Sequence, residues 1–118
     1  GPMISKAHLA KVRSYIELGP KEGATMLCGG LDRPSYAAEL PSQVAAGNYV
    51  WPTVFADVDN RMKIAQEEIF GPVACLIPFK DEADAIRIAT EFMELHRAHW
   101  PGFEGESEIR PIFDPGIG

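Results

Sequence analysis

Four side chains could take part in metal or thiol chemistry from their types alone. His96 and His99 are three residues apart near an expected helix end, a spacing that can place two imidazoles on one face within reach of a metal ion. No third ligand follows at a defining spacing, so the pattern favours histidines that are solvated or that stabilise the helix dipole. Cys28 and Cys75 are too distant to indicate a disulfide framework, and we expect Cys75 to be a small buried hydrophobe in a reducing cytoplasm.

Two adjacent carboxylates, Glu67 and Glu68, are the other chemically interesting groups. Taken alone they are typical of a solvated pair at a helix end, because carboxylates are rarely buried. Phe70 is expected to be a core or interface residue, and Gly71 with Pro72 a turn into a buried strand. The Gly29-Gly30 pair lacks Gly-x-Gly-x-x-Gly spacing and is not followed by a capped helix, so no phosphate loop is predicted.

Composition is that of a folded single domain. The chain has 118 residues, of which 46% are hydrophobic, enough to bury a core. Its net charge of −6, without a basic run, argues against nucleic-acid binding and against attraction to an anionic membrane surface. No apolar run approaches the length of a membrane span, and no signal pattern is visible at the N-terminus.

The helix that should begin the domain is predicted from Ser5, a suitable N-cap. Leu9, Val12 and Ile16 then form one apolar stripe. Gly19-Pro20 is expected to bend or interrupt this helix, and Gly23 to end it. His8 is expected to be exposed on the helix surface.

Three strands are predicted, at residues 24–28, 49–58 and 73–77, with a surface loop at residues 31–48. Pro52 lacks a ladder donor, which favours an edge position or a bulge for the second strand. The apolar run at 73–77 predicts a central strand covered on both faces. Asp59 or Asn60 is expected to cap a short helical turn before it.

Asp81 is the predicted N-cap of a second long helix, which must stop before Pro101. Residues 108–113 alternate charged and apolar side chains and predict a half-exposed final strand. The expected architecture is α/β or α+β, a two-layer sandwich with two main helices on a sheet of about four strands. Residues 1–118 would form one domain, which could be ferredoxin-like.

Four segments carry a family resemblance, in one order and at one spacing. They are residues 1–5 (Gly-Pro-Met-Ile-Ser), 24–30 (Ala-Thr-Met-Leu-Cys-Gly-Gly), 49–55 (Tyr-Val-Trp-Pro-Thr-Val-Phe) and 66–73 (Gln-Glu-Glu-Ile-Phe-Gly-Pro-Val). Over about residues 1–89 the chain resembles the aldehyde dehydrogenase superfamily, in particular the semialdehyde dehydrogenases of aromatic and amine catabolism.

This resemblance implies an oxidoreductase parent that uses NAD(P), with a thiolate attacking the aldehyde and hydride passing to the nicotinamide. It implies that Glu68 corresponds to a glutamate that accepts hydrogen bonds from the nicotinamide-side ribose, and that Phe70 corresponds to an aromatic residue packed near the cofactor. The family's nucleophilic cysteine, general base and nucleotide-binding domain lie upstream of the matched region. We therefore expect the isolated chain to be catalytically inactive and to bind no cofactor usefully.

Residues 90–118 follow a different pattern. Trp100 to Glu106 and Ser107 to Phe113 resemble the C-terminal end of YCII-related domains, which have a ferredoxin-like fold. The chain would then be a chimera joined inside one helix. Two alternative functions follow: a YCII-like module for small-molecule binding or catalysis, and an assembly module that forms a homodimer through an open sheet edge.

Overall fold

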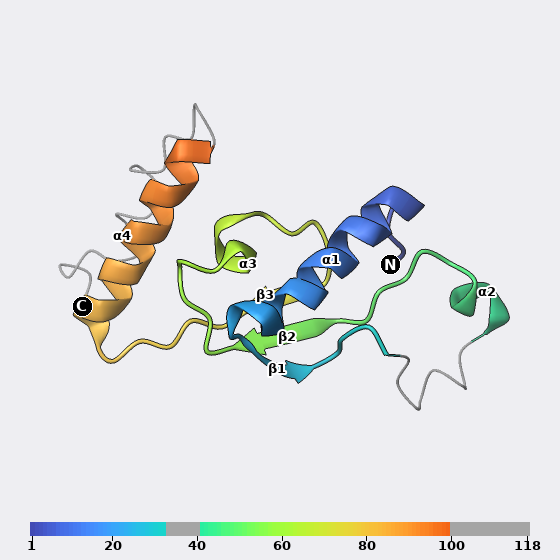
Figure 1. Cartoon of the computed structure of the whole chain (residues 1–118), viewed down its shortest axis with the longest axis horizontal. Coiled ribbons are helices and arrows are strands. Elements are labelled where there is room, and N and C mark those ends of the chain that lie inside the picture. The colour runs from blue at the N-terminus through green and yellow to red at the C-terminus, as the bar shows by residue number, and fades with distance from the viewer. Residues whose placement is uncertain (33–40, 100–118) are drawn as a thin grey trace, which may run out of the picture. The chain divides into compact units, whose positions relative to one another are not determined.

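The computed structural model describes residues 1–32 and 41–99, and Figure 1 shows their helices and strands. The chain divides into two compact units, Gly1–Pro78 and Phe79–Gly118, which are described separately below. The first unit is a mixed α/β arrangement, as predicted. The predicted strand at 108–113 lies outside the described residues, so the four-stranded and ferredoxin-like arrangements stay predictions. Part of the predicted loop at 31–48 forms a short helix, α2 (Ser42–Ala45).

Helix α1 (Lys6–Glu22) begins and ends where the sequence predicts. The Ser5 side chain accepts a hydrogen bond from the His8 backbone N–H at 3.1 Å. Gly23 ends the helix with a φ of 101°, a left-handed conformation that costs glycine little. The helix continues through Gly19 and Pro20, so an interruption there is wrong, while the alternative of a bend stays a prediction.

A close approach between helix and sheet explains the glycine at position 19. A Cβ atom there would lie 2.7 Å from the ring of Phe55, which is completely buried. The missing side chain thus makes room for the largest fully buried side chain. Gly19 serves the packing of α1 on the sheet, and it does not mark a helix end.

Three strands form the described sheet, in the order β1 (Thr25–Cys28), β2 (Thr53–Ala56), β3 (Val73–Cys75). β1 and β2 are antiparallel, whereas β2 and β3 are parallel with Thr53 opposite Val73. The predicted edge position of the second strand is wrong, since β2 is central, and the one register shift in this ladder falls in β1, between Met26 and Cys28. The prediction of a central third strand covered on both faces is also wrong, since β3 lies at an edge of the described sheet and Ala74 is exposed. Pro52 permits the central position of β2 because it precedes this strand, and the first ladder donor is Thr53 N–H, which bonds the Pro72 carbonyl at 2.9 Å.

The core lies between α1 and one face of this sheet (Figure 1). Its buried hydrophobic members are Val12, Tyr15, Ile16, Ala24, Phe55, Val58 and Ile64. The predicted apolar stripe of α1 is thus confirmed at Val12 and Ile16. Both side chains are 1% exposed, so this face of α1 is the one that packs into the core.

Helix α3 (Lys63–Gln66) is a single turn that is capped from a distance. The two carboxylate oxygens of Glu22 accept hydrogen bonds from the backbone N–H groups of Lys63 at 2.7 Å and Ile64 at 3.2 Å. No side chain caps the helix from Met62, the residue before it. The predicted local cap is wrong: Asp59 instead accepts from Arg61 N–H in the preceding turn.

Helix α4 (Glu82–His99) belongs to the second unit. As predicted, Asp81 caps it by accepting a hydrogen bond from Asp84 N–H at 2.9 Å. The predicted stop before Pro101 lies outside the described residues. Arg87 pairs with Asp84 and Glu91 along its surface. Among the described residues, no helix is both long and apolar enough to cross a bilayer.

Candidate functional site

The segment between α3 and β3 holds the two residues that the sequence singled out for cofactor contact. Glu68 and Phe70 are both exposed, and 67% of the Phe70 surface is accessible. Their neighbours Glu67, Ile69 and Gly71 are half-buried, so exposure alternates along the segment. Phe70 is therefore not a core residue, whereas the alternative that it lies at an interface stays a prediction. A hydrogen bond from Gly71 N–H to the Ile69 carbonyl at 2.8 Å closes a tight turn around Phe70.

The predicted solvated pair of carboxylates separates into two environments. Glu68 is exposed, but Glu67 accepts a hydrogen bond from the hydroxyl of Tyr15, which is 6% exposed. Lys63 Nζ lies 3.4 Å from the same carboxylate. The Tyr15 hydrogen bond, followed by the charge of Lys63, holds the pKa of Glu67 below its ordinary value against the opposing effect of burial. Burial, and then Glu67, raise the pKa of Tyr15.

His8 and Val12 contact the same segment from α1. The His8 ring is half-buried, not exposed as predicted, and its Nε2 is hydrogen-bonded to the backbone carbonyl of Phe70. A Cβ atom at Gly71 would lie 2.8 Å from Val12 Cγ1, so only glycine lets the backbone approach the helix this closely. The sequence reasoning missed these contacts, although the four- and three-residue spacing of His8, Val12 and Tyr15 already placed them on one helix face.

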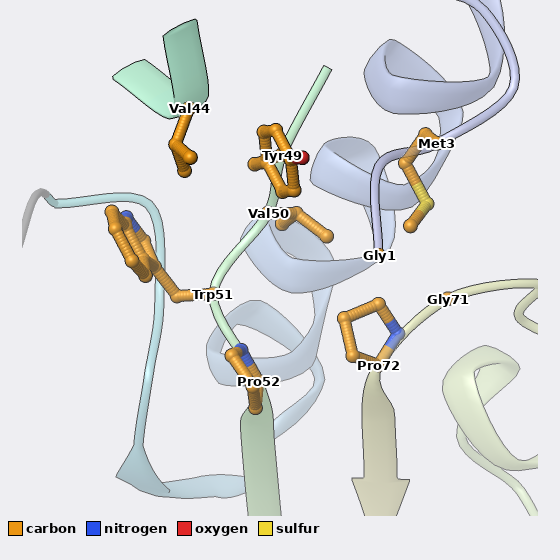
Figure 2. Close-up of a pocket in the computed structure, with 9 residues that line it drawn as sticks. All are labelled: Gly1, Met3, Val44, Tyr49, Val50, Trp51, Pro52, Gly71 and Pro72. Carbon is orange, nitrogen blue, oxygen red and sulfur yellow. The ribbon is translucent and has the colours of Figure 1, made fainter. Parts of the chain in front are cut away.

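A pocket of about 400 Å³ opens beside the end of this segment (Figure 2). It is lined by Gly1, Met3, Val44, Tyr49, Val50, Trp51, Pro52, Gly71 and Pro72. Figure 2 shows that Pro52 and Pro72 stand at the starts of β2 and β3, with Trp51 extending between the strand and Val44. The pocket thus lies at the amino ends of parallel strands, whereas ligands in α/β sheets bind outside their carboxyl ends.

Neither cysteine is placed as an activated nucleophile. The Cys75 thiol is half-buried and donates to the Ile64 carbonyl at 3.7 Å, and burial raises its pKa, which disfavours the reactive thiolate. Cys28 is exposed at the end of the edge strand β1. Cys75 fits the predicted role of a small apolar residue at the margin of the core.

Of the histidine pair, only the His96 side chain lies in the part of the chain that the structure describes. There, no group of three or more His, Cys, Asp or Glu residues could hold a metal ion. The His96 ring packs on Phe92, with ring centroids 4.1 Å apart. The His99 side chain lies outside what the structure describes.

Comparisons with known proteins agree on one family. The aldehyde dehydrogenase family matches residues 1–92. The chain is similar to 5-carboxymethyl-2-hydroxymuconate semialdehyde dehydrogenase of Escherichia coli, with 60% identity over 91 residues that cover 77% of this chain and 19% of that enzyme. It is 48% identical over 110 residues to betaine aldehyde dehydrogenase of Agrobacterium fabrum, covering 84% of this chain and 21% of the relative.

Solved structures show the same likeness in three dimensions. The Mycobacterium tuberculosis aldehyde dehydrogenase complexed with NAD+ superposes with a TM-score of 0.64 at 50% identity, over 75% of this chain and 17% of that one. An aldehyde dehydrogenase of Bartonella henselae gives the same TM-score at 44% identity, over 77% of this chain and 18% of its own. The chain spans about a fifth of the curated relatives it matches. Because the family match covers most of its length, this chain belongs to the aldehyde dehydrogenase family.

Proposed function

We propose that residues 1–92 form the part of an NAD(P)-dependent aldehyde dehydrogenase that presents Glu68 and Phe70 to the nicotinamide end of the cofactor. The observation that carries this proposal is the outward position of both side chains on a segment whose alternate residues face the core. A free carboxylate can accept hydrogen bonds from two ribose hydroxyls at once. Phe70 offers an exposed ring against which the cofactor can pack.

A semialdehyde is the substrate class that the relatives favour. The E. coli protein at 60% identity is named for a muconate semialdehyde, and the Bos taurus protein at 48% identity for 2-aminomuconic semialdehyde. We propose that the enzyme to which this segment contributes acts on an aldehyde of this kind.

We propose that the 118-residue chain alone is catalytically inactive. The family chemistry requires an activated thiolate, and burial raises the pKa of Cys75 while Cys28 lies at the outer edge of the sheet. Glu68 would also hold only one end of a flexible dinucleotide, which is too small a contact to offset the entropy of binding. NAD-dependent aldehyde oxidation by the pure chain would contradict this part of the proposal.

A hybrid enzyme tests the role of Glu68 directly. Residues 1–92 replace the matching region of the E. coli semialdehyde dehydrogenase, and the KM for NAD is measured for the hybrid and for its Glu68→Gln variant. Loss of charge-assisted bonds to the ribose should raise the KM by about tenfold or more. Glu17→Gln, which removes an exposed carboxylate on α1, is the control. An unchanged KM in Glu68→Gln would sink the proposed role.

An assembly role is the second candidate, and β1 favours it. Within the described sheet β1 pairs only with β2, and all four of its residues are exposed, Leu27 by 58%. Pairing of this edge with a second copy would satisfy its free backbone groups and cover Leu27. Light scattering should then report a dimer that Leu27→Lys weakens. A strict monomer at millimolar concentration would argue against a homodimer.

Residues 90–118 follow a sequence pattern that differs from the rest of the chain. We propose that residues 90–118 derive from a YCII-related domain joined within α4. The family match ends near this join, at residue 92, whereas the match to betaine aldehyde dehydrogenase covers 84% of the chain and counts against a foreign origin for the first residues of the tail. A strand found at residues 108–113 by NMR would support this origin. A helix there would contradict it.

A further inference from the structure

Three residues on one face of α1 contact the segment of residues 67–71. His8 contacts Phe70, Val12 contacts Gly71, and Tyr15 contacts Glu67. The three helix residues follow one another at intervals of four and three, which places them in a row along the helix. A single rigid helix therefore meets the whole of the segment that carries Glu68.

The Tyr15 contact is the strongest of the three by its chemistry. Its hydroxyl donates to an ionised carboxylate, and hydrogen bonds to charged acceptors are about twice as strong as neutral ones. Tyr15 itself cannot move freely, since it is 6% exposed and Lys11 Nζ lies 4.9 Å from its ring centre. The Glu67 end of the segment is thereby tied to the core.

The other two contacts fix the far end of the segment. The His8 ring is bonded to the Phe70 carbonyl, so the Phe70 backbone faces the helix while its ring faces solvent. Gly71 lies against Val12, which is 1% exposed, with no room for even a methyl group. Between these ends Ile69 packs on the core.

These contacts sort the segment into two sets of residues. Glu67, Ile69 and Gly71 are held by α1 and the core, and Glu68 and Phe70 alternate with them. With the held residues on the side of α1, and with a turn closed by the hydrogen bond from Gly71 N–H to the Ile69 carbonyl, the side chains of Glu68 and Phe70 lie on the exposed side. The direction of Glu68 is therefore set by residues that never touch the cofactor.

We propose that His8, Val12 and Tyr15 are positioning residues that hold the 67–71 segment so that Glu68 meets the cofactor ribose in a fixed orientation. This inference rests on the proposed role of Glu68. These contacts would preorganise Glu68, because a side chain held in the binding geometry loses less entropy when the ligand binds.

The first test measures order in the 118-residue chain, without any cofactor. Backbone 15N relaxation should show residues 67–71 as rigid as α1 in the native chain. Tyr15→Phe combined with His8→Leu should make these residues mobile while the rest of the first unit keeps its spectrum. His8→Gln, which retains a side-chain donor, should preserve more order than His8→Leu, and Glu17→Gln should change nothing. An equally rigid segment in the double variant would overturn the inference.

The second test uses the hybrid enzyme and separates this inference from the proposed function. Tyr15→Phe should raise the KM for NAD by about twofold to tenfold, the range that one hydrogen bond provides, with a smaller change in kcat. In the Glu68→Gln background the same substitution should have little further effect, because its target is gone. Equal effects of Tyr15→Phe in both backgrounds would refute positioning through Glu68. If Glu68→Gln alone leaves the KM unchanged, the proposed role of Glu68 fails, while the relaxation experiment still decides whether α1 holds the segment.

Discussion

The Tyr15 hydroxyl donates a hydrogen bond to the Glu67 carboxylate and so joins the middle of α1 to a segment 52 residues away. The contact stands directly beside Glu68, the residue proposed to bind the cofactor. A buried phenol and a charged carboxylate thus stabilise each other at the margin of the core.

Tyr15→Phe should raise the pKa of Glu67. The Tyr15 hydrogen bond is the largest cause that lowers this pKa, and burial acts in the opposite direction, so removing the hydroxyl leaves burial less opposed. The 13C chemical shift of the Glu67 carboxyl, followed against pH in the native chain and the variant, measures the change. Superimposable titration curves would show that the hydroxyl contributes nothing to the carboxylate.

The same pair predicts how stability depends on pH. Because the pKa of Glu67 is lowered in the folded chain, ionised Glu67 stabilises the fold at pH values above its ordinary pKa of 4.5. This stabilisation is lost as the pH falls through the pKa that Glu67 has in the folded chain. Because the pKa of Tyr15 is raised in the folded chain, the neutral phenol stabilises the fold at pH values below its ordinary pKa of 10.0. This stabilisation is lost as the pH rises through the pKa that Tyr15 has in the folded chain. Urea unfolding of the native chain at several pH values should show the free energy of unfolding falling at acid pH and again at alkaline pH. Both decreases should be smaller in Tyr15→Phe.

Gly71→Ala should destabilise the fold by about 1–3 kcal/mol, the usual cost of forcing a methyl group into a filled space. The new Cβ atom would lie 2.8 Å from Val12 Cγ1. Val12→Ala removes that obstacle, so the cost of Gly71→Ala should be smaller in the Val12→Ala background. Urea unfolding of the four proteins gives the coupling, and strict additivity would show that the Val12 contact is not the cause.

Glu22→Ala should cost about 0.5–2 kcal/mol, as loss of a helix cap usually does. Its carboxylate bonds the first two N–H groups of α3, at Lys63 and Ile64. Amide hydrogen exchange should therefore accelerate at those two residues while α1 stays protected. Glu17→Ala on the exposed side of the same helix is the matched control, and equal effects of the two substitutions would contradict a capping role.

Cys28 should react with iodoacetamide faster than Cys75. Cys28 is exposed, whereas burial raises the pKa of Cys75 and its thiol is bonded to the Ile64 carbonyl. Peptide mass spectrometry after timed labelling measures both rates in one sample, and labelling in urea supplies the reference in which the difference should vanish. Faster labelling of Cys75 in the folded chain would mean that the core around it opens readily.

Local signals in the sequence predicted the local structure well. The Ser5 cap, the Gly23 terminus and the Asp81 cap each depend on residues within one turn of the helix end, and the structure confirms all three. The motif around Glu68 likewise identified the family, because it is contiguous in sequence.

Contacts between distant residues could not be predicted in the same way. Glu22 caps α3 from 41 residues away, and no residue next to Lys63 in the sequence indicates that the cap comes from α1. The order of the strands depends on which neighbours pair, and the apolar run at 73–77 does not reveal that β3 lies at an edge of the described sheet with Ala74 and Leu76 exposed. Gly19-Pro20 favours a bend or an interruption from local sequence alone, whereas the ring of Phe55, which leaves no space for a side chain at position 19, lies far along the chain.

We propose that this chain folds as a part of an aldehyde dehydrogenase in which Glu68 and Phe70 form one side of a cofactor site and need other parts of such an enzyme to bind NAD. A two-dimensional amide NMR spectrum of the 118-residue chain, recorded without and with millimolar NAD, tests it most directly. The account predicts dispersed peaks for the first unit that do not move when NAD is added. Saturable shifts centred on Glu68 and Phe70 would contradict it, since they would mean that these residues bind the cofactor without the remainder of the enzyme.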